Sequence, residues 1–387
     1  MILSPAILRR ELLLAVKHLP GGGTQEEKRR AAEPWRIQFV RQMFDRKPYF
    51  AKREDEFLSN LASGALFDPE KIQPQLFVCK SREDFDVYDY FRMWSSFPTL
   101  DRPGRRLKFI VRDAGIPSKP IMGLCCLSSP VRSIRVRDHW IAWQDRPRIR
   151  QKNLAMVMDL STCIGLPPYS YLTAGKLLAA MMASNEVREA YRARYALQRS
   201  RIRRRILTDI VLLMTSACYS SNAAQYKGLG FTSSQLFRFI GYTSGYSTFQ
   251  IPPDLYGQVK KFVIKRRRTA NPTRDGGPSA KIRILRWAAR DLSISEQRLV
   301  YTGHRRAVFA APLARNWREF LLGHTSRIEY FDYTLECLIR RWKEKWLKRR
   351  CENSIVMDKV YRFHPEELRM TRTLGSVGPN LLHSELN

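Results

Sequence analysis

Positively charged side chains cluster at three places in the middle of the chain. Five arginines occupy the seven positions 199–205, and six cations occupy the nine positions 260–268. A third group places six arginines within residues 132–150, with Trp140 and Trp143 between them. Arginine forks can pair with phosphate oxygens two at a time, and aromatic faces can stack on bases. These clusters therefore predict contacts with the backbone of a nucleic acid.

We predict that fifteen residues of these clusters contact phosphates. They share a long cationic side chain and a position close in sequence to other cations. The predicted contact residues are Arg132, Arg135, Arg137, Arg148, Arg150, Arg201, Arg203, Arg204, Arg205, Lys260, Lys261, Lys265, Arg266, Arg267 and Arg268. The alternative for any single arginine is an ordinary solvated side chain, and for Trp140 and Trp143 it is core packing. The prediction therefore rests on the clustering.

The overall charge balance favours the same partner. The chain of 387 residues carries a net charge of +32, and residues 101–300 supply +24 of it through 36 basic and 12 acidic residues. Such a surface repels itself unless a polyanion covers it, and nucleic acid is the commonest such partner. An acidic partner protein is the alternative. The chain is 44% hydrophobic and 11% aromatic, a composition that excludes a disordered basic tail.

Motifs of familiar enzyme classes are incomplete in this sequence. Gly175-Lys176 lacks the first glycine and the final Ser or Thr of a phosphate-binding loop, because Ser170 and Leu177 stand at those positions. Seven cysteines occur without a CxxC pair and without a histidine at zinc-ligand spacing, so we expect reduced thiols and no metal site. The sequence therefore favours a binding protein over an enzyme.

The sequence predicts neither a secretion signal nor a membrane span. The apolar start of the chain is interrupted by Arg9-Arg10-Glu11 before a signal sequence can form. No uncharged apolar run reaches the ~18 residues that a membrane helix needs. We therefore expect a cytoplasmic protein.

The basic clusters lie in a segment whose pattern is typical of a mixed α/β domain. Short apolar runs predict strands at 76–79, 108–112, 121–127, 154–160 and 206–214. Residues 132–137 alternate polar and apolar side chains, which predicts a further strand with Arg135 and Arg137 on one face. Helices are expected at 172–183 and at about 222–227. Strands separated by helices predict a central sheet with helical layers.

Helical regions are expected on both sides of this domain. Apolar residues at helical spacing predict helices at 5–19, 26–46, 50–63, 282–290 and 315–350. Ser4 and Pro5 favour the start of the first helix, and the Gly- and Pro-rich stretch 271–278 is the best linker candidate. We therefore expect three parts: a helical region 1–75, a basic α/β core 76–270 and a basic helical region 279–387.

The segment from Ser118 to Lys261 resembles a known family. Its landmarks are Pro120-Ile121-Met122-Gly123-Leu124, Ser128-Ser129-Pro130-Val131-Arg132-Ser133, Arg137-Asp138-His139-Trp140-Ile141-Ala142-Trp143 and then Arg148 to Asn153. This pattern is similar to the DruA family, the small basic component of the bacterial Druantia anti-phage defence system. The resemblance implies a role in antiviral defence. It also implies other Druantia subunits, including a large helicase-like protein, as partners.

A second similarity lies within the same segment. The stretch from Asn222 to Phe231 resembles the helix and glycine–Phe turn near the end of the GNAT acyltransferase fold. The resemblance implies a GNAT-like central sheet-and-helix domain. In active members, a Gly-rich loop at the start of the middle helix holds the pyrophosphate of acetyl-CoA. The matching positions here include Thr173, Gly175 and Lys176, and this loop keeps only one glycine.

We therefore predict an antiviral defence component that binds nucleic acid, expected to be DNA, through its basic α/β core. It would assemble with other defence subunits and need no cofactor. Two alternatives stay open. One is a GNAT-type acyltransferase that uses acetyl-CoA to modify nucleic acid or an amine. We do not prefer it, because a fold does not carry activity without its site. The other is a structural adaptor that docks an acidic partner protein.

Overall fold

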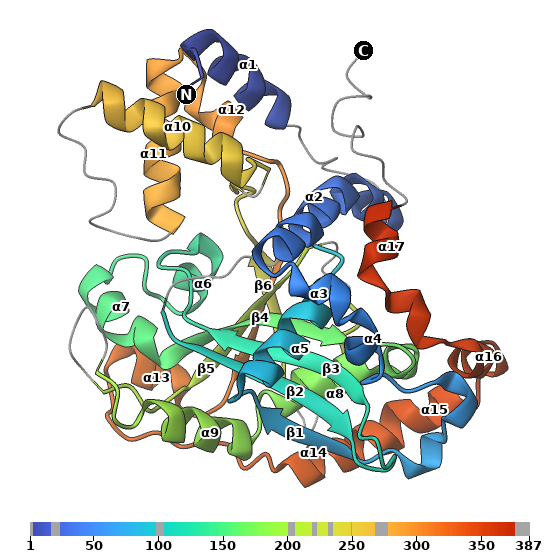
Figure 1. Cartoon of the computed structure of the whole chain (residues 1–387). Coiled ribbons are helices and arrows are strands. Elements are labelled where there is room, and N and C mark those ends of the chain that lie inside the picture. The colour runs from blue at the N-terminus through green and yellow to red at the C-terminus, as the bar shows by residue number, and fades with distance from the viewer. Residues whose placement is uncertain are drawn as a thin grey trace.

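The centre of the fold is a seven-stranded mixed sheet with helices on both faces (Figure 1). A computed structural model describes residues 3–16, 24–97, 104–199, 206–218, 223–230, 235–248, 250–267 and 278–375. The strands are β1 (Pro74–Val78), β2 (Arg106–Asp113), β3 (Ile121–Ser128), β4 (Val157–Gly165), β5 (Leu212–Ala217), β6 (Arg238–Tyr242) and β7 (Ala307–Pro312). The expected mixed α/β class is confirmed.

The strand order is β1-β2-β3-β4-β5-β7-β6, and β4 and β5 form its parallel pair. A parallel pair needs a crossover connection, which is supplied here by α8 (Ala174–Met181) and α9 (Asn185–Tyr195). The β4–β5 ladder runs from Val157 and Leu212 to Asp159 and Met214. Both strands continue beyond that point without pairing with each other. The start of α8 lies close to this divergence, since its Gly175 approaches Gly165 at the end of β4.

Alternation along the strands divides the core into two layers. Cys125 and Leu127 of β3 face one layer, whereas Leu124 and Cys126 face the other, so the strand is buried on both sides. The first layer is covered by α8, α9 and α14 (Leu335–Trp342). The other is covered by two sets of helices: α2 (Gln25–Arg46), α3 (Tyr49–Lys52), α4 (Glu54–Leu58) and α5 (Arg82–Arg92); and α6 (Arg135–Trp140), α7 (Pro147–Asn153) and α13 (Trp317–Leu322).

Four helices form a lobe of their own at the upper left of Figure 1. They are α1 (Pro5–Ala15), α10 (Pro253–Arg266), α11 (Pro278–Asp291) and α12 (Glu296–Val300). Leu8 and Leu12 of α1 are fully buried against Val259 and Val263 of α10. The N-terminal helix therefore shares a hydrophobic core with the helices that connect β6 to β7.

The C-terminal helices return to the N-terminal part of the chain. After α14, a π-helical turn (Lys343–Leu347) leads into α15 (Lys348–Cys351), α16 (Ser354–Arg362) and α17 (Met370–Gly375). The buried Glu54 carboxylate accepts hydrogen bonds from the main-chain N–H groups of Met370 and Thr371, and α17 lies against α2 (Figure 1). Short 3-10 turns lie at Gly64–Leu66, Pro69–Lys71, Leu154–Met156, Tyr169–Leu172 and Pro365–Leu368. No described helix combines the length and apolar character needed to cross a bilayer.

Several expected elements differ from the structure. The predicted strand at 132–137 is wrong, because Arg135 begins α6 and the Asp138 N–H donates to Ile134 as in a helix. The strand expected at 206–214 begins only at Leu212. Around 222–227, the described residues form turns rather than a helix. The long helix expected at 315–350 is divided into α13 and α14 by an extended segment. Strand β7 was not predicted from the sequence. It is defined by pairing with β5 and β6, which are distant from it in sequence.

Candidate nucleic-acid interface

Exposed arginines gather where α6 and α7 cover the sheet near β6. Arg132 and Arg135 lie just before and at the start of α6, and Arg148 lies in the first turn of α7. All three are exposed, and within the described part of the chain no carboxylate pairs with them. Two further exposed arginines, Arg238 on β6 and Arg318 on α13, were not among the predicted contacts. The structure therefore brings together arginines that are far apart in sequence.

Close packing between α6 and β6 holds these arginines in place. Gly241 of β6 has a φ of +129°, and a Cβ atom there would come within 2.7 Å of Val136 Cγ2 on α6. Glycine permits both the left-handed backbone and the close approach. At the other end of α6, the indole rings of Trp140 and Trp317 stack with centroids 4.4 Å apart. Since both ends of α6 are fixed, Arg135 has a defined position beside β6.

Two of the predicted contact arginines in this region are occupied within the protein. The Arg137 side chain is fully buried, and its guanidinium Nη2 lies 2.6 Å from Asp138 Oδ1. The same guanidinium donates to the main-chain oxygens of Val131 and Arg132. Arg150 donates to the other oxygen of the same carboxylate across 3.0 Å. A buried guanidinium that is paired in this way cannot reach a phosphate. We therefore leave Arg137 out of the interface and assign it to folding. Arg150 is half-buried, and its charge is balanced by the same carboxylate.

The cations of 260–267 lie in the helical lobe, which stands above α6 and α7 in Figure 1. Lys261, Lys265 and Arg266 are exposed on α10, and Lys260 is half-buried. Arg267 is paired with Asp291 across 2.7 Å, so its charge is already balanced. The remaining predicted contacts lie outside the described residues; they are Arg201, Arg203, Arg204, Arg205 and Arg268.

Trp140 and Trp143 are packed within the protein, as the core-packing interpretation predicted, so other aromatic residues are available for stacking. Trp143 is fully buried and donates its indole N–H to the Leu321 carbonyl oxygen, and Trp140 is packed on Trp317. Exposed aromatic rings lie instead along and after the edge strand β6, at Phe239, Tyr242 and Tyr246, which are 45%, 41% and 54% exposed. The Arg305 guanidinium lies 5.4 Å from the Tyr242 ring centroid. The run Arg238-Phe239-Ile240-Gly241-Tyr242 carries the aromatic enrichment of a strand, a signal that could have revealed them.

Two of the three positions that the resemblance assigns to an acetyl-CoA loop contact other parts of the protein. The Lys176 ammonium donates to the main-chain oxygens of Ala224 and Lys227, and burial beside Lys345 lowers its pKa. The Gln225 side chain covers Gly175, where a Cβ atom would lie 3.4 Å from it. Thr173 has a left-handed backbone, and its side chain does not cap α8. A pyrophosphate at this loop would have to displace the contacts of Lys176 and Gln225.

Comparison with known proteins agrees with the family resemblance. The family model described as Druantia protein DruA matches residues 36–323. The chain belongs to the DruA family. Druantia protein DruA of Escherichia coli (strain UMEA 4076-1) is 26% identical over 282 residues, which cover 72% of this chain and 69% of that protein. No solved structure matches the chain.

Family membership supports the expected place in an anti-phage Druantia system. The part matched by the DruA model begins within α2 and ends just after α13, so it includes all seven strands. It also includes α6, α7 and the lobe helices α10 to α12, on which exposed cations lie. Among the described residues, no group of three or more His, Cys, Asp or Glu side chains could hold a metal ion.

Proposed function

We propose that this chain is the nucleic-acid-binding component of an anti-phage Druantia system, with DNA as the ligand. The observation that carries the proposal is the presence of exposed arginines, without ion pairs in the described part of the chain, on adjoining elements: α6 packs on the edge strand β6, and α7 is joined to α6 through Arg150 and Asp138. The exposed arginines are Arg132, Arg135, Arg148 and Arg238. Arginines placed in this way on a chain of net charge +32 favour a polyanion over a neutral partner.

The electrostatics of DNA explain why such a surface binds strongly. Each phosphate that an arginine neutralises releases a condensed counterion, so affinity falls steeply as salt increases. Arginine forks add directed hydrogen bonds to phosphate oxygens. The exposed rings of Phe239, Tyr242 and Tyr246 add stacking faces beside these charges. Together they support binding that depends on the nucleic-acid backbone and tolerates many sequences.

We also propose that the core is GNAT-like in fold but does not transfer acyl groups. Two features support the fold likeness. The helices α8 and α9 connect β4 to β5, and these two strands are parallel. The contacts of Lys176 and Gln225 argue against a bound acyl-CoA. We propose further that the chain assembles with other Druantia subunits, including a helicase-like protein, and that it is cytoplasmic. Membership in the DruA family supports the assembly.

Charge reversal on the α6–α7 surface tests this function. The triple variant Arg132→Glu/Arg135→Glu/Arg148→Glu should weaken binding of a fluorescent DNA to the full chain at every sequence tested. The slope of log affinity against log salt should fall by about three, since each lost phosphate contact removes about 0.9. The matched control is Arg340→Glu/Arg341→Glu/Arg349→Glu. It makes the same charge change on exposed arginines of α14 and α15.

Comparison of the two variants separates a local site from a general charge effect. The control should bind more weakly than the unaltered chain only to the extent that the total charge matters. The α6–α7 variant should lose far more. Equal affinities and equal salt slopes in the two variants would contradict the proposed interface, and so would an unaltered chain that does not bind DNA.

A further inference from the structure

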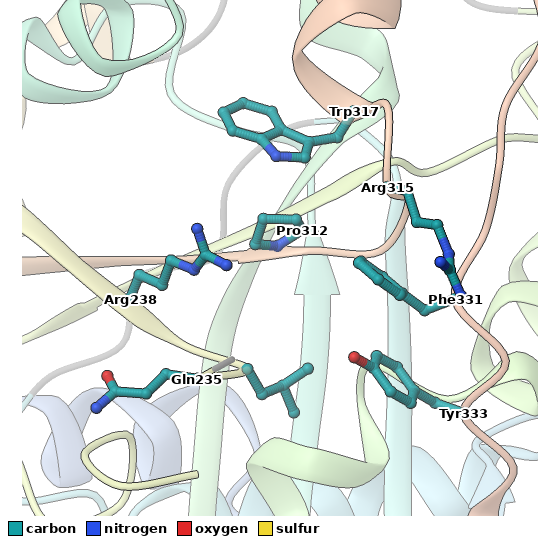
Figure 2. Close-up of a pocket in the computed structure, with 8 residues that line it drawn as sticks. Gln235, Arg238, Pro312, Arg315, Trp317, Phe331 and Tyr333 are labelled. Atoms are coloured by element: carbon teal, nitrogen blue, oxygen red, sulfur yellow. The ribbon is translucent and has the colours of Figure 1, made fainter. Parts of the chain in front are cut away.

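A small pocket opens at the end of the sheet where β7 ends and β6 begins (Figure 2). Its volume is about 170 Å³. The lining residues are mostly aromatic, apolar or cationic: Gln235, Leu236, Arg238, Pro312, Arg315, Trp317, Phe331 and Tyr333. None of the described residues that line it is acidic. Pockets for drug-sized ligands measure about 300–1,000 Å³, so this one has room for a single small ring system.

The aromatic side of the pocket is rigid. Phe331 and Tyr333 are two residues apart in an extended segment, so they point to the same side, and their rings stack with centroids 5.4 Å apart. The Phe331 N–H donates to the Leu313 carbonyl oxygen across 2.9 Å, and the Tyr333 N–H donates to Asn185 Oδ1 across 3.2 Å. These hydrogen bonds fix the segment against the end of β7 and the start of α9. The stacked pair therefore exists before any ligand enters.

The opposite wall is equally well supported. Trp317 begins α13, is 9% exposed, and stacks on Trp140 at an interplanar angle of 14°. The Arg318 guanidinium lies 4.8 Å from the Trp317 ring centroid and donates to the Trp140 carbonyl oxygen. Figure 2 shows the Trp317 ring on one side of Pro312 and the rings of Phe331 and Tyr333 on the other. Flat aromatic walls suit a planar ligand.

Two cations stand at the sides of this aromatic pocket. Figure 2 shows the side chains of Arg238 and Arg315 on opposite sides of Pro312. Both are exposed, and in the described ranges neither forms an ion pair with a carboxylate. The Arg315 guanidinium lies 5.8 Å from the Phe331 ring centroid, so it stays beside the aromatic wall. An aromatic-lined pocket between two such guanidinium groups is suited to a planar ring that has a negatively charged group on each side of it.

We propose that this pocket takes one unpaired nucleobase of a single-stranded nucleic acid, with Arg238 and Arg315 on the phosphates that flank it. The inference rests on the proposed function and deepens it, because it names single strands as the ligand class. A base within a duplex cannot enter a pocket of this size together with its partner. A base in a single strand can, and it gains stacking on Phe331 and Tyr333 in place of its neighbours.

Binding measurements on the full chain test the inference with four probes. They are a fluorescent single-stranded DNA, the duplex of the same sequence, a strand of abasic nucleotides and a free deoxynucleoside monophosphate. The substitution Phe331→Leu removes the flat ring and keeps an apolar side chain. The double variant Arg238→Ala/Arg315→Ala removes both cations, and Arg340→Ala/Arg341→Ala on α14 is its matched control. The Phe331 side chain is half-buried and the four arginines are exposed, so folding should survive each of these substitutions.

We expect the unaltered chain to bind the intact strand about tenfold more tightly than the abasic strand, in line with the value of one base–aromatic stack. Phe331→Leu should remove most of that difference and leave duplex binding unchanged. Arg238→Ala/Arg315→Ala should weaken single-strand binding more than its control does. These results would support the pocket as a site for one base of a strand.

Other results would overturn the inference in distinguishable ways. If the unaltered chain binds DNA but Phe331→Leu leaves the ratio of intact to abasic binding unchanged, the pocket is not a base site although the proposed function stands. If the free mononucleotide binds through Phe331 while strand binding does not depend on it, the pocket serves a free nucleotide instead. If the unaltered chain binds none of the probes, the inference and the proposed function both fail.

Discussion

The side-chain amide of Gln225 donates to the main-chain carbonyl oxygen of Cys163 across 2.9 Å. Cys163 lies in the part of β4 that has stopped pairing with β5, so this carbonyl is one that the sheet leaves open. The same glutamine side chain lies over Gly175 at the start of α8. One residue therefore spans both the divergence of the two strands and the loop that the GNAT resemblance assigns to a cofactor.

This contact predicts that acetyl-CoA does not bind. A ligand that binds only the folded chain raises the midpoint of thermal unfolding, by an amount that grows with its concentration over its dissociation constant. We expect no rise for the unaltered chain at millimolar acetyl-CoA, measured by differential scanning fluorimetry. The variant Gln225→Ala tests whether this side chain is what closes the loop. A rise in the unaltered chain would contradict the geometry of Gln225 and Lys176 and revive the acyltransferase alternative.

The buried pair of Arg137 and Asp138 predicts a large effect on stability. Arg137→Ala would leave the Asp138 carboxylate buried with Arg150 as its remaining cation, and two main-chain oxygens would lose their donor. Breaking a buried ion pair in this way costs about 3–5 kcal/mol of unfolding free energy. Chemical denaturation measures this change directly.

A neighbouring exposed arginine provides the control for that prediction. Arg132→Ala should change the unfolding free energy by less than about 0.5 kcal/mol, because this side chain is exposed and unpaired in the described structure. Its effect should fall on DNA affinity instead. A small stability change for Arg137→Ala, or equal DNA affinities for Arg132→Ala and the unaltered chain, would contradict the roles assigned to these two arginines.

Local signals in the sequence were sufficient wherever short-range contacts decide the structure. Ser4 caps α1 by accepting from the Ile7 N–H, as its position before Pro5 predicted. The uninterrupted apolar run at 121–127 predicted a strand, and all eight residues of β3 are buried. The bounds of α2 came within one residue of the prediction, because its capping box and its end are marked locally.

Long-range contacts decided the features that the sequence did not reveal. The alternation in 132–137 fits a strand as well as a short helix. The chain forms a helix there, with Arg137 buried beside Asp138 and Val136 packed on Gly241. The pocket depends on Phe331 and Tyr333 meeting β6, which no spacing in the sequence indicates. The sequence landmarks predicted the correct family. Whether each arginine is exposed or buried could be assigned only from the three-dimensional structure.

The buried Glu54 carboxylate predicts that the C-terminal helix can be released by one substitution. This carboxylate accepts from Tyr90 Oη across 2.8 Å and from the N–H groups of Met370 and Thr371 across 2.8 and 3.1 Å. Glu54→Ala leaves buried donors without an acceptor, at a cost of about 1–3 kcal/mol each. We expect hydrogen exchange to increase in α17 first. Asp358→Ala, which removes an exposed carboxylate from α16, should leave α17 protected.

The last prediction concerns acid stability and rests on His304. Its imidazole is 6% exposed and stacks on Phe97 with ring centroids 5.4 Å apart. Burial, with the nearby Arg306 and Lys28 cations, lowers its pKa from 6.5 to about 4. Between these two values the unfolded chain binds a proton that the folded chain does not. The folded state therefore loses stability as pH falls below about 6.5, and the loss is complete below about 4.

The size of this loss follows from the two pKa values. At pH 5 it amounts to about 2 kcal/mol relative to pH 7, and it approaches about 3 kcal/mol near pH 4. His304→Phe keeps an aromatic ring against Phe97 and removes the titrating group, so the difference in unfolding free energy between pH 7 and pH 5 should shrink by about 2 kcal/mol. His324→Phe replaces an exposed histidine and should leave that difference unchanged. An unaltered pH dependence in His304→Phe would mean that His304 is protonated as readily in the folded chain as in the unfolded one.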